Sequence, residues 1–128
     1  MQTVLVIDDN AAIRMIIADF IKMTFEQTTV KEATDGLEGI ALINEELPDL
    51  ILLDAEMPNM DGFEVVKRLK ESEATKNIPV IAISSGATGN PIVAGLRAMS
   101  DANLPKPFTP DELINVVDHV RSSGHIVA

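Results

Sequence analysis

The chain has 128 residues, a length that fits one domain with a single core. Hydrophobic residues make up 46% of it and include four Phe but no Tyr or Trp, so the core is expected to be aliphatic, as in a parallel sheet covered by helices. Its formal net charge of -10 argues against nucleic acid or an anionic membrane as a partner, because phosphate groups would be repelled. Cysteine is absent, which excludes disulfides and thiolate metal sites, and no signal peptide or membrane span is recognisable, so we expect a cytoplasmic protein.

The first apolar run, Val4 to Ile7, predicts a buried strand, and it ends on Asp8 and Asp9. Asn10 can then cap a helix. The apolar residues of that helix recur at helical spacing, and they are Ile13, Ile16, Ile17, Phe20 and Ile21.

The second run, Thr28 to Ala33, alternates apolar and polar residues and predicts an exposed edge strand. Asp35, with Glu38 three residues later, predicts the capped start of a second helix that ends before Pro48. Its apolar residues include Leu37, Ile40, Ala41 and Ile43.

The third run, from Leu50, has four aliphatic residues without a polar break and then ends on Asp54. Such a run is typical of a strand that is buried on both faces. Turn-forming residues 57–59 follow, and Asp61 predicts the cap of the third helix. Because Asp61 serves as the cap, Asp54 is free for chemistry at the loop where open α/β sheets place their sites.

The fourth run, Val80 to Ile83, ends on two hydroxyl residues, Ser84 and Ser85. A glycine-rich connection at 86–89 is expected to be loose, and Asn90 can cap the helix that follows it. The last strand, Ala102 to Pro105, is short because proline cannot donate to a ladder, which places it at a sheet edge. A final helix is predicted by the capping box that begins at Thr109, and residues 122–128 are expected to form a loose tail.

This alternation of strand and helix demands parallel strands joined by right-handed crossovers. The three wholly apolar runs must be central, and the two mixed runs must lie at the edges. The predicted fold is therefore a single α/β domain, a flavodoxin-like (βα)5 doubly wound parallel sheet with strand order 2-1-3-4-5.

In that order Asp8, Asp9 and Asp54 converge at one end of the sheet. Carboxylates within roughly 4 to 8 Å of one another repel unless a cation joins them, and an all-oxygen site with open positions suits Mg²⁺ better than Ca²⁺. Ser84 and Lys106 reach the same end. A cation site, a carboxylate nucleophile, a hydroxyl and an ammonium are the parts needed for phosphoryl transfer.

With these residues in register, the sequence resembles a receiver domain of the two-component response regulators, of the stand-alone, chemotaxis-regulator type. The resemblance covers Val4 to about Val120 and rests on Asp8-Asp9, Asp54 with Met57-Pro58 and Asp61-Gly62, Ser84, and Lys106-Pro107-Phe108. Each motif is weak alone, but the set in this order is highly specific. The resemblance implies a receiver domain at 1–121, a short tail at 122–128 and no output domain.

The resemblance implies that Asp54 is phosphorylated by the phospho-histidine of a sensor histidine kinase or histidine phosphotransfer protein. Asp9, Asp54 and the backbone carbonyl of Glu56 would ligate Mg²⁺, with Asp8 acting through water. The protein would not be an enzyme on other substrates, because it would catalyse only its own phosphorylation and slow dephosphorylation.

The resemblance also implies that Ser84 and Lys106 each bind a phosphoryl oxygen, and that the Lys106-Pro107 bond is cis. A monomer or weak dimer would signal by protein contact through the face formed by the fourth helix, fifth strand and fifth helix. Its partners would be proteins, not nucleic acid or membrane.

Three positions depart from the family pattern. Asn103 stands where receivers commonly carry an aromatic residue that turns inward, which puts the usual switch in doubt. Pro105 precedes the lysine, and Met99 replaces a helix-ending glycine. Glu56 occupies a variable position that influences the lifetime of the phosphoryl group.

Two other functions compete with this interpretation. A phosphatase or phosphotransferase enzyme could use Glu56 as its general acid, but the length leaves no room for a specificity domain. A receiver-like module that binds partners without phosphorylation would be expected to lack Asp54, Lys106 or the acid pair, and all are present. A flavin carrier is disfavoured, because there is no Tyr or Trp to stack on the ring.

Overall fold

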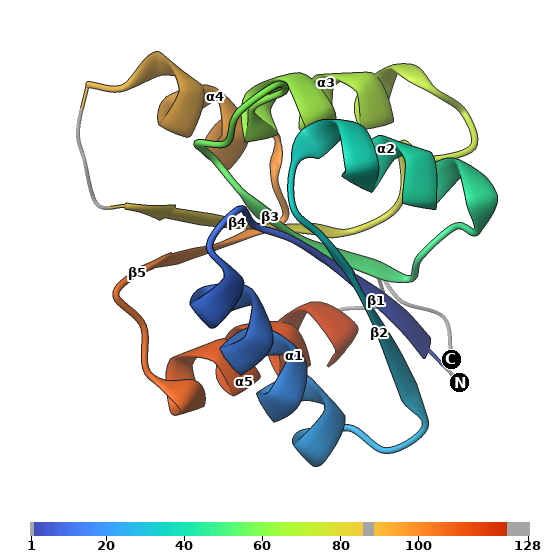
Figure 1. Ribbon diagram of the computed structural model, residues 1–128, viewed down its shortest axis with the longest axis vertical. Helices are drawn as coiled ribbons and strands as arrows, with labels where there is room; N and C mark the ends of the chain where they lie inside the picture. Colours follow the sequence, from blue (N-terminus) through green and yellow to red (C-terminus); the bar gives the residue numbers. More distant parts are fainter. Residues whose placement is uncertain (1, 86–88, 123–128) are drawn as a thin grey trace.

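The computed structural model describes residues 2–85 and 89–122 as a five-stranded parallel sheet covered by helices on both faces (Figure 1). The strand order is β2-β1-β3-β4-β5, which confirms the predicted flavodoxin-like topology. The elements in chain order are β1 (Gln2–Ile7), α1 (Ala11–Thr24), β2 (Thr28–Ala33), α2 (Gly36–Glu45), β3 (Leu50–Asp54), α3 (Gly62–Glu71), β4 (Val80–Ser85), α4 (Pro91–Met99), β5 (Ala102–Lys106) and α5 (Pro110–Val120). Most of the glycine-rich connection, 86–88, and the tail from 123 onward lie outside the described residues.

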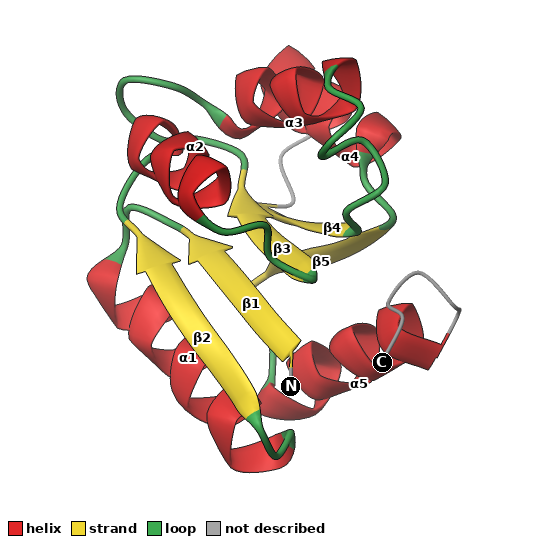
Figure 2. Cartoon of the chain, turned by 90° about the vertical axis from the view of Figure 1, so that its right-hand side faces the viewer, coloured by secondary structure: helices red, strands yellow, loops and turns green. Residues whose placement is uncertain are grey.

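The helices form two layers, with α2, α3 and α4 on one face of the sheet and α1 and α5 on the other (Figures 1 and 2). Alternate residues of the central strands enter opposite layers. In β3, Ile51 and Leu53 belong to the apolar cluster under α2 to α4, whereas Leu50 and Leu52 belong to the cluster under α1 and α5. Burial on both faces is the physical reason for the unbroken apolar run.

Every predicted helix cap is present. Each capping side chain accepts a hydrogen bond from a backbone N–H in the first turn of its helix, and the caps are Asn10, Asp35, Asp61, Asn90 and Thr109. Thr109 and Glu112 form a reciprocal capping box, with donor–acceptor distances of 3.1 and 2.9 Å. Asp61 therefore starts α3, which leaves Asp54 free for other contacts.

Three apolar residues expected on buried helix faces are exposed instead, and one of them is the small Ala41 of α2. Ile16 of α1 is 47% exposed and Leu37 of α2 is 53% exposed. Neighbouring helical residues are turned by about 100°, so Ile17 fills the core and Ile16 lies at its margin. Strand β5 also continues one residue past the predicted end, to Lys106, because Pro105 lies on an edge strand where its missing N–H is tolerated. None of the helices within the described residues is long and apolar enough to cross a bilayer.

Two glycines permit close approaches that shape the functional end of the sheet. An added Cβ at Gly62 would collide with the backbone carbonyl of Asp54. At Gly95 it would lie 2.6 Å from ring atoms of Phe63, so this glycine lets α4 pack closely on α3. The loop after β3 and the α3–α4 contact therefore have little spare room.

Candidate functional site

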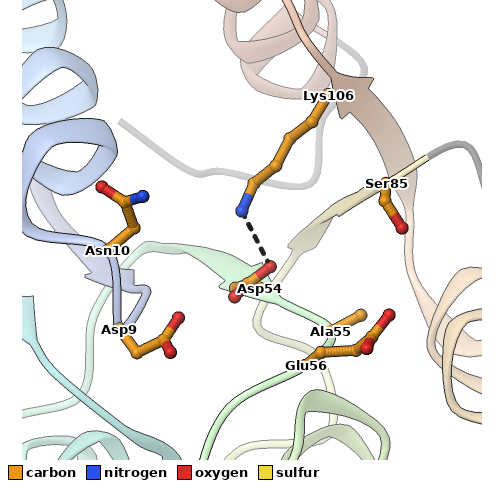
Figure 3. A pocket seen from close by; sticks show the side chains of 7 residues that line it. All are labelled: Asp9, Asn10, Asp54, Ala55, Glu56, Ser85 and Lys106. Carbon is orange, nitrogen blue, oxygen red and sulfur yellow. Dashed lines mark hydrogen bonds and ion pairs between the residues drawn. The ribbon is translucent and has the colours of Figure 1, made fainter.

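The carboxyl ends of the central strands surround an open cavity of about 520 Å³ (Figure 3). Asp54 is the last residue of β3 and Lys106 the last residue of β5, and both point into this space. The lining residues come from the carboxyl ends of four strands and the loops after them, and they are Asp9, Asn10, Asp54, Ala55, Glu56, Ser85 and Lys106. The cavity lies where the strand order reverses, which is the place that open parallel sheets use for ligands.

Three carboxylates meet at this cavity, as the sequence predicted. Oxygens of Asp8, Asp9 and Asp54 all lie within 4.8 Å of one another. Asp8 is fully buried and Asp54 is 5% exposed, whereas Asp9 is exposed. Asp8 Oδ1 accepts a hydrogen bond from the backbone N–H of Asn10 at 2.8 Å, but its Oδ2 has no hydrogen-bond partner among the described residues. A buried carboxylate oxygen in this state fits a divalent cation or a water molecule bound to one.

Lys106 supplies a positive charge to the cluster. Its Nζ lies 3.2 Å from Asp54 Oδ1 and 3.3 Å from Asp8 Oδ2. One ammonium neutralises at most one of the three carboxylates, so the cluster retains a negative charge that attracts a cation.

The local environment raises the pKa of Asp54. Burial is the main cause, the neighbouring carboxylate of Asp8 adds to it, and Lys106 opposes it, so that the pKa rises from 3.8 to about 6. For Lys106, burial acts to lower the pKa, but the carboxylates of Asp54 and Asp8 outweigh burial and raise it. At neutral pH the carboxylate of Asp54 is therefore ionised at a cost in free energy, while the ammonium of Lys106 stays charged.

Glu56 follows the strand end and lines the cavity with an exposed side chain. Its Oε1 accepts a hydrogen bond from Asn90 Nδ2 at 3.2 Å, while Asn90 Oδ1 caps α4. The loop after β3 is thereby connected to the first turn of α4. The backbone carbonyl of Glu56 as a metal ligand stays a prediction.

Ser84 is the predicted site residue whose hydroxyl does not face the cavity. It is 1% exposed, and its Oγ accepts a hydrogen bond from Arg97 Nε of α4 at 3.2 Å. The neighbouring Ser85 lines the cavity instead. The structure thus brings Asp8, Asp9 and Asp54 together with Lys106, and leaves the Ser84 hydroxyl on the α4 side.

Sequence reasoning missed Arg14. This residue of α1 donates from Nη1 to the backbone carbonyl of Asp8 at 2.8 Å and from Nε to Glu32 Oε1 at 3.1 Å. It therefore holds the peptide that joins the two adjacent acids. The signal available in the sequence was a basic residue one helical turn after the cap Asn10, on a helix whose other inward positions are apolar.

The fold and the site define the class of this protein, which is an α/β domain with a doubly wound parallel sheet that carries three carboxylates and a lysine at its switch point. Comparison with known families shows which family of this class the chain belongs to. The model of the response regulator receiver domain matches residues 4–118, and the chain belongs to this family. Receiver domains are the signalling domains of two-component systems, so the predicted resemblance to a receiver domain is confirmed, while the stand-alone type stays a prediction.

Curated relatives agree with this family. The chain is 36% identical over 113 residues to the phosphate regulon transcriptional regulatory protein PhoB of Pseudomonas aeruginosa, covering 88% of this chain and 48% of that protein. It is 34% identical over 125 residues to the nitrate/nitrite response regulator protein NarL of Escherichia coli, covering 98% of this chain and 56% of that protein. The chain spans about half the length of these relatives.

A solved structure of similar size also matches. The chemotaxis response regulator CheY4 of Vibrio cholerae has a TM-score of 0.83 and 29% sequence identity, covering 94% of this chain and 98% of that chain. The expected cis bond between Lys106 and Pro107 is present in the structure.

Proposed function

We propose that Asp54 accepts a phosphoryl group from the phospho-histidine of a sensor histidine kinase or a histidine phosphotransfer protein. The observation that carries this proposal is the buried Asp54 carboxylate, which lies in an open cavity beside two further acids and 3.2 Å from Lys106 Nζ. A carboxylate is a competent nucleophile for phosphorus, and the open cavity leaves room for the donor side chain.

Each part of the transfer can be given to a residue of this chain. An Asp54 oxygen attacks phosphorus, the bond between phosphorus and the donor nitrogen breaks, and the electron pair returns to the imidazole. Lys106, already within ion-pair distance of Asp54, pairs with a phosphoryl oxygen as charge moves onto the aspartate. Ser84 is proposed to bind another phosphoryl oxygen. The same site would catalyse only slow loss of the phosphoryl group to water.

The acid cluster is proposed to hold Mg²⁺ through Asp9, Asp54 and the carbonyl of Glu56, with Asp8 acting through a bound water. The fit rests on the buried Asp8 Oδ2, which accepts no hydrogen bond and has only the ammonium of Lys106 near it among the described residues, and on an all-oxygen set within 4.8 Å. When bound, the ion supplies positive charge that neutralises the phosphoryl oxygens and the crowded carboxylates.

The output is proposed to be a protein contact on the face formed by α4, β5 and α5, made by a monomer or weak dimer in the cytoplasm. What supports this face is the link between α4 and the cavity, through Glu56–Asn90 at its first turn and Ser84–Arg97 further along. The acting unit is proposed to be residues 1–121, with 122–128 as a tail. Asn103, in place of an aromatic residue, is exposed on β5.

Intact-mass analysis after incubation with acetyl phosphate and Mg²⁺ tests the phosphoacceptor. The wild type and Asp111→Asn, an exposed acid of α5 used as a matched control, should each gain the mass of one phosphate. Asp54→Asn should gain none, and excess chelator should prevent the gain in the other two proteins. A phosphate that persists in Asp54→Asn, or that forms in chelator, contradicts the proposal.

A further inference from the structure

In this structure the hydroxyl of Ser84 is bonded to Arg97 on the α4 side of the sheet, and Ser84 does not line the cavity. Val80 and Ala82, two and four residues earlier in β4, belong to the apolar cluster beneath α2, α3 and α4. Because strand residues alternate, Ser84 continues that face, and Ser85 takes the position at the cavity. Ser84 is nonetheless adjacent to the phosphoacceptor, since Ile83 pairs with Asp54 across the two strands.

Arg97 provides the hydrogen bond that keeps Ser84 in this place. A hydroxyl that is 1% exposed needs a partner, and Arg97 Nε donates to its Oγ at 3.2 Å. A charged donor makes this bond stronger than one between neutral groups. Among the described residues no carboxylate lies within ion-pair distance of Arg97, so the guanidinium has no competing acid partner there.

We propose that Arg97 is a positioning residue that holds the Ser84 hydroxyl outside the cavity until a phosphoryl group on Asp54 draws it in. This inference rests on the proposed function of Asp54. To reach a phosphoryl oxygen, the Oγ of Ser84 has to turn about its χ1 torsion away from α4, and this turn breaks the hydrogen bond from Arg97 Nε. The half-buried guanidinium is then exposed to water, and one of the two side-chain hydrogen bonds that join α4 and its cap to the cavity rim within the described residues is lost.

A double-mutant cycle with beryllium fluoride, which mimics a phosphoryl group on an aspartate, tests the role of Arg97. In the presence of Mg²⁺, Arg97→Met should bind beryllium fluoride about three- to tenfold more tightly than the wild type, since no hydrogen bond has to be broken first. In a Ser84→Ala background the same Arg97→Met change should have no effect, because the hydroxyl that couples the two sites is gone.

The sign of this effect separates positioning from general electrostatics. Removing a positive charge from a chain of net charge -10 should weaken the binding of an anion, whereas the proposal requires tighter binding. Arg68→Met, which removes an exposed arginine from α3, is the matched control and should not tighten binding. Weaker or unchanged binding by Arg97→Met, or a gain that survives in Ser84→Ala, overturns the proposal.

A second measurement uses the unmodified residue, in case Arg97→Met unfolds. The Nε–H resonance of Arg97 in the wild type should move on addition of beryllium fluoride toward its position in Ser84→Ala. A resonance that stays in place while fluorine spectra show the site filled contradicts the proposal. Failure of beryllium fluoride to bind the wild type at all is a different result, which counts against phosphorylation of Asp54 and not against the role of Arg97.

Discussion

The guanidinium of Arg14 holds the backbone carbonyl of Asp8, with 2.8 Å between Nη1 and the oxygen. The same side chain is anchored on the other side by Glu32 of the edge strand β2, and it is only 15% exposed. The hydrogen bond from Arg14 to the Asp8 carbonyl fixes the peptide between Asp8 and Asp9. It thereby fixes the direction in which these two acids present their carboxylate oxygens. Groups behind a metal site that orient its ligands commonly control its affinity.

Arg14→Met should therefore weaken Mg²⁺ binding by about tenfold, which is the lower end of the range for such supporting contacts. Removing a positive charge should by itself favour a cation, so the expected loss has the opposite sign to the general charge effect. Titration calorimetry measures the affinity. Lys22→Met, an exposed lysine of the same helix, is the control and should bind Mg²⁺ at least as well as the wild type.

Asp54→Asn should stabilise the metal-free protein at neutral pH. The pKa of Asp54 is raised from 3.8 to about 6, so between these values the native state binds its proton more tightly than the unfolded chain does. The free energy of unfolding of the wild type therefore falls as the pH rises through that window, and above it the whole contribution of the Asp54 proton has been lost. Asparagine removes this penalty, so the free energy of unfolding should increase by roughly 1 to 3 kcal/mol at pH 7.5.

Urea unfolding of the two proteins in chelator at several pH values measures this difference. The advantage of Asp54→Asn should shrink as the pH falls from 6 and should be lost below 3.8, where the carboxyl is mainly protonated in both states. A constant difference across the range would mean that the effect has another origin than the titration of Asp54. Mg²⁺ should raise the melting temperature of the wild type more than that of Asp54→Asn, because the ion relieves the same repulsion.

Lys106→Ala should slow phosphorylation far more than Ser84→Ala. Removing the ammonium takes away positive charge from the transferred group, and losses of about 100-fold are typical for such contacts. The Ser84 hydroxyl faces α4 before the reaction, so its loss should leave the transfer largely intact. The initial rate with acetyl phosphate measures both, and equal losses in the two variants would contradict this division of roles.

Gly62→Ala should destabilise the domain by about 2 to 3 kcal/mol, because the added methyl group meets the carbonyl of Asp54 and the backbone has to shift. Gly95→Ala should cost less, since the neighbouring atoms belong to the outer part of the half-buried Phe63 ring, which can rotate away, and alanine favours the helix. Chemical denaturation compares the two. A smaller effect at Gly62 than at Gly95 would count against this account of the close approaches.

Much of the fold could be predicted because its signals are local. Asp61 and Thr109 mark helix starts by chemistry that acts within one turn, and both cap their helices. The strand order followed from burial, since only central strands tolerate apolar runs such as Leu50 to Leu53. The acid cluster followed in turn, because parallel strands bring their carboxyl ends together.

The direction of Ser84 could not be predicted for a related reason. Residues 80–83 are apolar without alternation, so the run that identifies a central strand hides which of its side chains face which layer. The partners of Arg14 were also out of reach. Glu32 is 18 residues away and comes close only through the pairing of β1 with β2.

The two links between α4 and the cavity, Glu56–Asn90 and Ser84–Arg97, have a consequence for any protein that binds this helix. Coupling free energy is reciprocal, so under the proposed mechanism a target that binds α4 more tightly after Arg97 has released Ser84 also favours phosphorylation of Asp54, by the same free energy. The amount of phosphorylated protein in a cell would then depend on the abundance of its target as well as on its kinase.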